Sequence, residues 1–165
     1  MNSISKFSMY IKKISDNILA SLLALIVAIM FTQVVFRYTF NNSLSWSEEI
    51  AKFLFIWITF IGAALCFRDY MHLGVDFLLE KVSGKHRSFL LIFNTFLTTA
   101  FNGAMIVIGF IWVHDVSGTL SPAVGLPLNI VFYAAFPCSA LLSFIYGLER
   151  LQSEFKKNNQ NKIVK

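Results

Sequence analysis

The chain has 165 residues, of which 56% are hydrophobic, 16% aromatic and only 14% charged, with a formal net charge of +5. Soluble domains typically carry about 25% charged residues, so this chain has too few of them to cover a water-facing surface. The composition excludes a disordered, collagen-like or disulfide-framework protein and argues against a soluble enzyme. The sequence shows no nucleic-acid-binding motif. It therefore predicts an integral membrane protein whose main surroundings are the lipid bilayer.

Four apolar stretches predict an all-α protein with four transmembrane helices, because a helix crosses roughly 30 Å of hydrocarbon with about 20 apolar residues. The first stretch has one strongly polar interior residue, Gln33, and we expect it to be a retained anchor because it ends without a small-residue cleavage site. The second reaches full length only if its helix begins near Ser47 and includes Glu48, Glu49 and Lys52. We expect a membrane domain over residues 1–150, a basic cytoplasmic tail over 151–165, and spans at about 17–36, 47–68, 88–112 and 126–148.

The positive charges lie almost entirely on one side of these predicted spans. Three Lys precede the first span, four Lys or Arg lie between the second and third, and five follow the fourth, which makes twelve. The opposite side has only Arg37 and Lys52. Because cytoplasmic segments are enriched in Lys and Arg, this asymmetry predicts that both termini are cytoplasmic.

The segment between the second and third spans has helical periodicity. Met71 and Val75 belong to an apolar face, while His72 and Asp76 belong to a polar one. The pattern predicts an amphipathic cytoplasmic helix that lies along the membrane or against a partner. Carboxylates and imidazole at this spacing can bind a metal, but a solvated face with an intrahelical His72–Asp76 pair is the favoured interpretation, so no metal site is expected.

The cores of the four predicted spans contain no Asp, Glu, Lys, Arg or His. Ion-coupled transport and proton relays need ionisable groups at membrane depth, so this absence argues against transport by the chain alone. Haem binding would need His on facing helices inside the bundle, and none of the three His is placed there. We expect no enzyme activity and no cofactor, with a stand-alone small channel or transporter as the alternative function.

Two polar groups remain candidates for contacts. The charges around the start of the second span pair with each other or with a neighbouring protein, and the sequence leaves both possibilities open. The third span carries Asn94, Thr98 and Asn102 at i, i+4 and i+8. Such a stripe could line a transport pathway, but helix packing in lipid uses it more often.

The segment from Val35 to Phe77 resembles the small membrane subunit, of DctQ type, of tripartite ATP-independent periplasmic (TRAP) transporters. It contains Val-Val-Phe-Arg-Tyr, Ser-Trp-Ser-Glu-Glu and Arg-Asp-Tyr-Met-His-Leu-Gly-Val-Asp-Phe in that order. This part is about a quarter of the chain, and the third and fourth spans resemble the family only in hydrophobicity. The residues that carry the resemblance are Arg37, Asn41, Trp46, Glu48, Glu49, Trp57, Gly62, Arg68, His72 and Asp76.

The resemblance implies a multi-pass protein of the bacterial inner membrane. In this family a periplasmic solute-binding protein captures a carboxylate solute, and a large membrane subunit carries it inward, driven by sodium. The small subunit binds the large one, widens its static scaffold and is a candidate to help dock the binding protein. The solute is left open between a C4-dicarboxylate and a sialic acid.

Carried over residue by residue, the resemblance implies two contact clusters and no catalytic, substrate, sodium or metal residue. The cytoplasmic contact cluster would comprise Arg68, His72 and Asp76. The outer partner-contact cluster would comprise Arg37, Asn41, Trp46, Glu48, Glu49 and Lys52.

Overall fold

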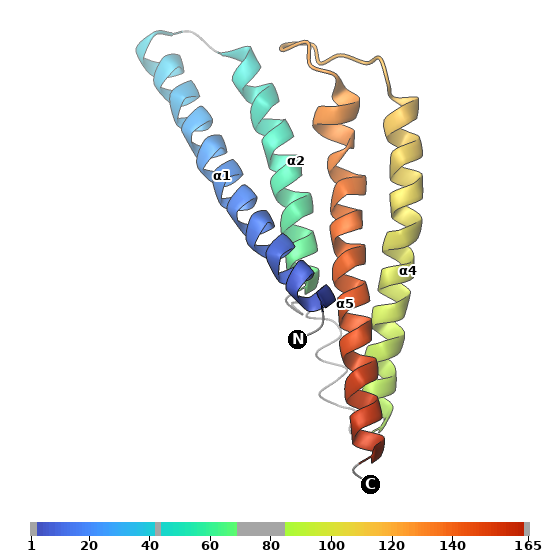
Figure 1. Cartoon of the computed structure of the whole chain (residues 1–165). Coiled ribbons are helices and arrows are strands. Elements are labelled where there is room, and N and C mark those ends of the chain that lie inside the picture. The colour runs from blue at the N-terminus through green and yellow to red at the C-terminus, as the bar shows by residue number, and fades with distance from the viewer. Residues whose placement is uncertain (1–2, 42–43, 69–84, 164–165) are drawn as a thin grey trace.

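The computed structural model describes residues 3–41, 44–68 and 85–163, and the side chains over 7–41, 44–68 and 89–156. Over these ranges the chain forms four long helices and one short π-helix (Figure 1). Their bounds are α1 Ser3–Thr39, α2 Ser45–Arg68, α4 Lys85–Asp115, η1 Asn129–Tyr133 and α5 Ala135–Ile163.

The helices confirm the prediction of an all-α protein with four membrane spans. Four of them are long and apolar enough to cross a bilayer, over Phe7–Thr39, Ser45–Arg68, Phe89–Asp115 and Asn129–Lys156. The helix α1 has 37 residues, which corresponds to roughly 55 Å, so it is longer than the hydrocarbon is thick. The predicted amphipathic helix, with His72 and Asp76, lies outside the described residues.

The helix α5 continues through most of the predicted polar tail, as far as Ile163. The tail contains four Lys, two Gln and one Glu, which are good helix formers. Nothing after Gly147 in this region interrupts a helix, since no Gly or Pro follows it. The tail is therefore an extension of the fourth span over the residues that the structure describes.

The four helices lie in a row in the order α1, α2, α5, α4 (Figure 1). Over the described ranges α4 packs on α5 and η1 but not on α1 or α2, while α2 and α5 pack together in the middle. The start of α1 and the end of α5 lie at one end of the row, which we call the terminal end. The segment 116–128 lies at the opposite end, the loop end, where α1 leans away from α2 (Figure 1).

Small residues allow the close approach of α4 and α5. Thr95 and Thr99 are buried between them, and each hydroxyl donates a hydrogen bond to the carbonyl four residues earlier on α4. Gly147 of α5 faces Thr99 so closely that a Cβ atom there would overlap the threonine hydroxyl. Without a hydrophobic driving force between helices in lipid, such close packing is a main source of association.

The fourth span is irregular at its loop end, where η1 precedes α5. Pro137 is buried in the first turn of α5 and lacks the N–H that would bond to the carbonyl of Tyr133. The indole Nε1 of Trp57 donates a hydrogen bond of 2.8 Å to the carbonyl of Val131 within η1. The irregular turn is therefore attached to α2 by a side chain.

Candidate functional site

The segment 116–128 forms a compact loop at the loop end. Ser121 and Leu126 face each other across it, with a hydrogen bond of 2.8 Å from the Ser121 N–H to the Leu126 carbonyl. Gly118 and Gly125 have φ angles of 95° and 73°, which residues with a Cβ atom adopt only with strain. The backbone conformation of this loop therefore depends on two glycines and on the hydrogen bond between Ser121 and Leu126.

Glu49 of α2 connects this loop to the second span. Its Oε2 accepts hydrogen bonds from the Ser121 hydroxyl at 3.1 Å, the Ala123 N–H at 3.0 Å and the Val124 N–H at 2.9 Å. Hydrogen bonds to a carboxylate are stronger than those between neutral groups. Glu49 therefore positions the loop over the start of α2, more than 70 residues earlier in the chain.

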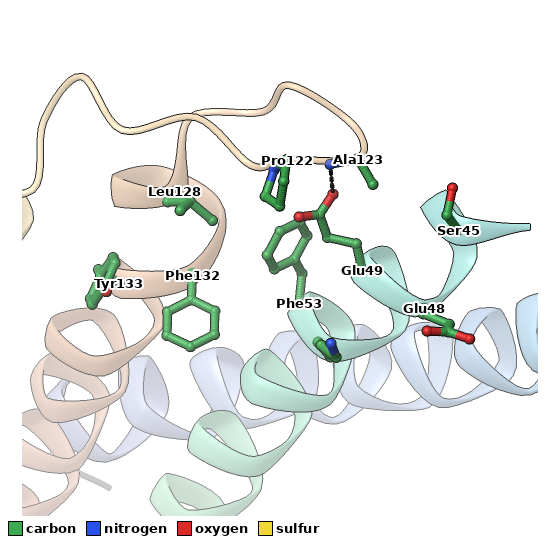
Figure 2. A pocket seen from close by; sticks show the side chains of 10 residues that line it. Ser45, Glu48, Glu49, Phe53, Pro122, Ala123, Leu128, Phe132 and Tyr133 are labelled. Atoms are coloured by element: carbon green, nitrogen blue, oxygen red, sulfur yellow. Dashed lines mark hydrogen bonds between the residues drawn. The ribbon is translucent and has the colours of Figure 1, made fainter.

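A pocket of about 280 Å³ lies beneath the contact between Glu49 and the loop (Figure 2). Its apolar wall is formed by Phe53 of α2 and by Phe132 and Tyr133 of η1. Figure 2 shows the Glu49 carboxylate directed toward Ala123, with the Phe53 and Phe132 rings lying below the loop. Glu48 and Lys52 also line the pocket, so it combines an aromatic wall with both signs of charge.

The structure divides the predicted outer cluster. Glu48, Glu49 and Lys52 line the pocket, whereas Arg37, Asn41 and Trp46 do not and are all exposed. The sequence left open whether these charges pair with each other or with a neighbouring protein. Over the described ranges, no Glu48–Lys52 ion pair is formed, and Glu48 Oε1 instead accepts a hydrogen bond of 3.0 Å from Gln33 Nε2 on α1. Glu48 thus connects α1 with α2, while Glu49 connects α2 with the loop.

At the terminal end, Arg68 lies where α1, α2 and α5 meet. Its Nε is 3.4 Å from the Ser8 hydroxyl oxygen and 3.9 Å from Glu149 Oε2, and its guanidinium carbon lies 5.5 Å from the centre of the Tyr146 ring. The Ser8 hydroxyl also donates a hydrogen bond to Glu149. One side chain of the predicted cytoplasmic cluster therefore joins three helices, while the two others lie outside the described residues.

Sequence reasoning missed the partners of Arg68. Glu149 is the first acidic residue after the predicted fourth span, and Arg68 is the last residue of the predicted second span. Both were predicted to lie on the same side of the membrane, so their opposite charges were the available signal. Ser8 and Tyr146 offered no comparable signal, because hydroxyl and aromatic groups recur throughout the apolar stretches.

The predicted stripe on the third span lies beside the buried face of α4. Asn94, Thr98 and Asn102 are half-buried. Thr98 Oγ1 donates to the Asn94 carbonyl at 2.7 Å, and Asn102 Nδ2 donates to the Thr98 carbonyl at 2.8 Å, so both bonds stay within α4. The fully buried contacts with α5 are made by the neighbouring Thr95 and Thr99, and the packing role of the stripe stays a prediction.

The contacts of Glu48, Glu49 and Arg68 hold helices and a loop together. Such contacts are typical of a structural or protein-binding site and not of a catalytic one. In the part of the chain that the structure describes, no group of three or more His, Cys, Asp or Glu could hold a metal ion. The charged side chains of the pocket and of the Arg68 cluster lie near helix ends, and residues 53–67 and 116–148 contain no Asp, Glu, Lys, Arg or His.

Comparison with known proteins agrees with the resemblance stated from the sequence. The family model of the DctQ component of tripartite ATP-independent periplasmic transporters matches residues 26–157. A presumed TRAP transporter small permease protein of Haemophilus influenzae is 30% identical over 136 residues, which cover 82% of this chain and 84% of the relative.

Two further relatives have names that include a solute. The sialic acid TRAP transporter permease protein SiaT of Haemophilus influenzae is 29% identical over 89% of this chain, which spans only 24% of that longer protein. The sialic acid TRAP transporter small permease protein SiaQ of Vibrio cholerae is 29% identical over 61% of this chain and 58% of its own length. These relatives are transporter subunits and not enzymes. The extent of the family match and the four apolar helices together show that the chain belongs to the DctQ family, the small permease subunits of TRAP transporters.

Proposed function

We propose that the chain is a non-catalytic scaffold and docking subunit of a sodium-coupled TRAP transporter that imports a carboxylate solute. One observation carries the proposal: in this member of a transporter family, the apolar cores of the spans, residues 17–36, 53–67, 89–112 and 126–148, contain no Asp, Glu, Lys, Arg or His. A subunit that moves ions or a carboxylate through the membrane by itself would need ionisable groups at membrane depth. Transport itself is therefore assigned to a partner.

The proposed main partner is the large membrane subunit of the transporter. In SiaT and in the isethionate TRAP transporter permease protein DctMQ of Oleidesulfovibrio alaskensis, the region similar to this chain is about a quarter of the protein. The remaining part of these permeases supports a large subunit as the natural neighbour of a DctQ chain. The open row of helices leaves faces of α1 and α4 uncovered within the described chain, which suits such a neighbour.

We assign the loop end to the periplasm and the terminal end to the cytoplasm, because twelve of the fourteen Lys and Arg occur in the segments before the first span, between the second and third spans, and after the fourth. The pocket and the loop held by Glu49 would then face the periplasmic solute-binding protein. Arg37, Asn41 and Trp46 are exposed and would belong to the same periplasmic side. Arg68, with His72 and Asp76, would belong to the cytoplasmic contact zone. The proposed location is the bacterial inner membrane, as expected for a TRAP transporter subunit with four apolar helices.

The solute is proposed only as a class. Relatives are named for sialic acid and for C4-dicarboxylates, both of which carry carboxylate groups. The pocket does not distinguish between these solutes. Its charged residues carry both signs and its wall is aromatic, so it has no feature that favours one carboxylate over the other. The solute is therefore selected elsewhere, in the binding protein and the large subunit.

Affinity purification of the tagged chain from its own membranes in mild detergent tests the proposal. We expect a large multi-span membrane protein to be retained, and we expect deletion of the gene for this chain to abolish uptake of the organic acid. An unrelated tagged four-span protein from the same membranes is the control for adventitious retention. Purification of the chain without such a partner, together with unchanged uptake in the deletion strain, would contradict the proposal.

A further inference from the structure

Gln33 is the one strongly polar side chain inside the apolar stretch 17–36, and it is only 8% exposed. Its Nε2 donates to Glu48 Oε1 at 3.0 Å. Since a carboxylate only accepts hydrogen bonds, this contact determines which way the amide points. The other amide atom, Oε1, is buried without a hydrogen-bond partner among the described residues. A buried acceptor without a donor is unfavourable, and more so in hydrocarbon, where water cannot replace the donor.

Glu48 is exposed on α2 and brings a negative charge beside Gln33. In the described part of the chain it forms no ion pair, neither with Lys52 one turn later on α2 nor with Arg37 one turn after Gln33 on α1. Its position in the first turn of α2 is favourable for a negative charge. The helix N-terminus does not supply a hydrogen-bond donor to Gln33 Oε1. Gln33 Oε1 and the Glu48 carboxylate are therefore two neighbouring acceptors that a single donor could bind.

The surroundings of Gln33 are apolar and open. The α1 helix leans away from α2 toward the loop end (Figure 1). Around Gln33, Met30 is 43% and Val34 is 49% exposed, and Phe31 is 70% exposed. Gln33 lies six residues before the end of α1, roughly 9 Å along the helix axis, and within the predicted span 17–36, so we expect this region to lie near the membrane boundary at the loop end.

We infer that Gln33 and Glu48 form a socket for a Lys or Arg side chain on a membrane helix of the large subunit, which packs against the exposed face of α1. The inference rests on the proposed function and deepens it by naming the contact face. A cationic side chain donates several hydrogen bonds, so it satisfies Gln33 Oε1 and neutralises Glu48 at once. A neutral amide would donate a hydrogen bond to Gln33 Oε1 but would not neutralise Glu48. The proposed partner side chain is therefore a cation.

Retention of the large subunit by tagged variants tests the socket. Glu48→Gln keeps the hydrogen bond from Gln33 but removes the charge, and we expect it to lower retention about tenfold or more. Gln33→Leu removes the amide and is expected to have a similar effect. Thr32→Val is the matched control, because the exposed Thr32 hydroxyl bonds only to the Ala28 carbonyl of its own helix, and retention should be unchanged.

A photoreactive amino acid at Met30 or Val34 tests the contact face without altering the socket. We expect both positions to crosslink to the large subunit in membranes that contain the intact transporter. Ile111, 56% exposed and near the loop end of α4, is the control position. Crosslinking from Ile111 but from neither α1 position would overturn the assigned face, as would crosslinks from α1 to lipid alone.

The outcomes separate this inference from the proposed function. If the unaltered chain retains no large subunit, the proposed function fails. If it does, but Glu48→Gln retains as much as the unaltered chain, the socket is wrong and the function stands. Restored retention in the double variant Arg37→Glu with Glu48→Arg would also overturn the socket, because the partner cation would then lie within the chain.

Discussion

Replacing Gly147 with alanine is expected to lower the free energy of unfolding by about 1–3 kcal/mol, the usual cost of overpacking. A Cβ atom at position 147 would overlap the Thr99 hydroxyl and lie 3.1 Å from the Thr99 Cβ. Since α4 packs only on α5 and η1 over the described ranges, the short η1 would be the one other helix in contact with α4. The measurement is unfolding of the purified chain in mixed micelles with increasing denaturing detergent.

Gly62→Ala is the matched control, because Gly62 is also helical but has no atom within 4 Å of the position of a new Cβ. We expect this variant to be as stable as the unaltered chain or slightly more stable, since alanine favours a helix over glycine. Adding Thr99→Ala to Gly147→Ala removes most of the overlapping atoms and should recover part of the loss. Equal stability of the two glycine variants would contradict the described packing of α4 on α5.

Replacing Glu49 with alanine is expected to detach the loop 116–128 from α2. The substitution removes three hydrogen bonds to one carboxylate oxygen. Because hydrogen bonds to charged groups each contribute about 1.5–3 kcal/mol and are not additive, we expect the unfolding free energy to fall by about 2–3 kcal/mol. Hydrogen exchange is the direct measurement, and the Ala123 and Val124 amides should lose their protection.

Asp115→Ala provides the control for removing a carboxylate near the loop end. Asp115 is exposed, and its recorded contact in the described chain is with the neighbouring His114 at 3.8 Å. Exposed charges of this kind contribute little, so stability and amide exchange in the loop should stay as in the unaltered chain. Unchanged protection of Ala123 and Val124 in Glu49→Ala would show that the loop holds its shape without α2.

The number of spans was predictable because hydrophobic length alone specifies it, and the four helices confirm it. The order of the helices in the row was not predictable from hydrophobicity. In lipid both the packed and the exposed faces of a helix are apolar, so the pattern of α4 does not reveal that, within the described chain, it packs on α5 and η1 and not on α1 or α2. The close contact between Thr99 and Gly147 depends on how far α4 and α5 are shifted along each other. The sequence of either helix alone does not determine this shift.

The candidate site was predictable as a group of charges but not as a set of contacts. Glu48 and Glu49 are adjacent in sequence, yet one bonds to a side chain of α1 and the other mainly to backbone N–H groups of the loop. Backbone donors carry no sequence signal, so the role of Glu49 was invisible. Gln33 was visible as an isolated polar residue, but its partner depends on how α1 crosses α2.

Solute uptake by reconstituted vesicles tests most directly the claim that this chain supports a transporter without transporting. One set of vesicles contains the chain alone, and a second also contains the co-purified large subunit, with the binding protein outside and an inward sodium gradient. We expect the second set to accumulate a labelled sialic acid or C4-dicarboxylate and the first set to accumulate neither. Accumulation of solute against its gradient by vesicles that contain only this chain would contradict the account.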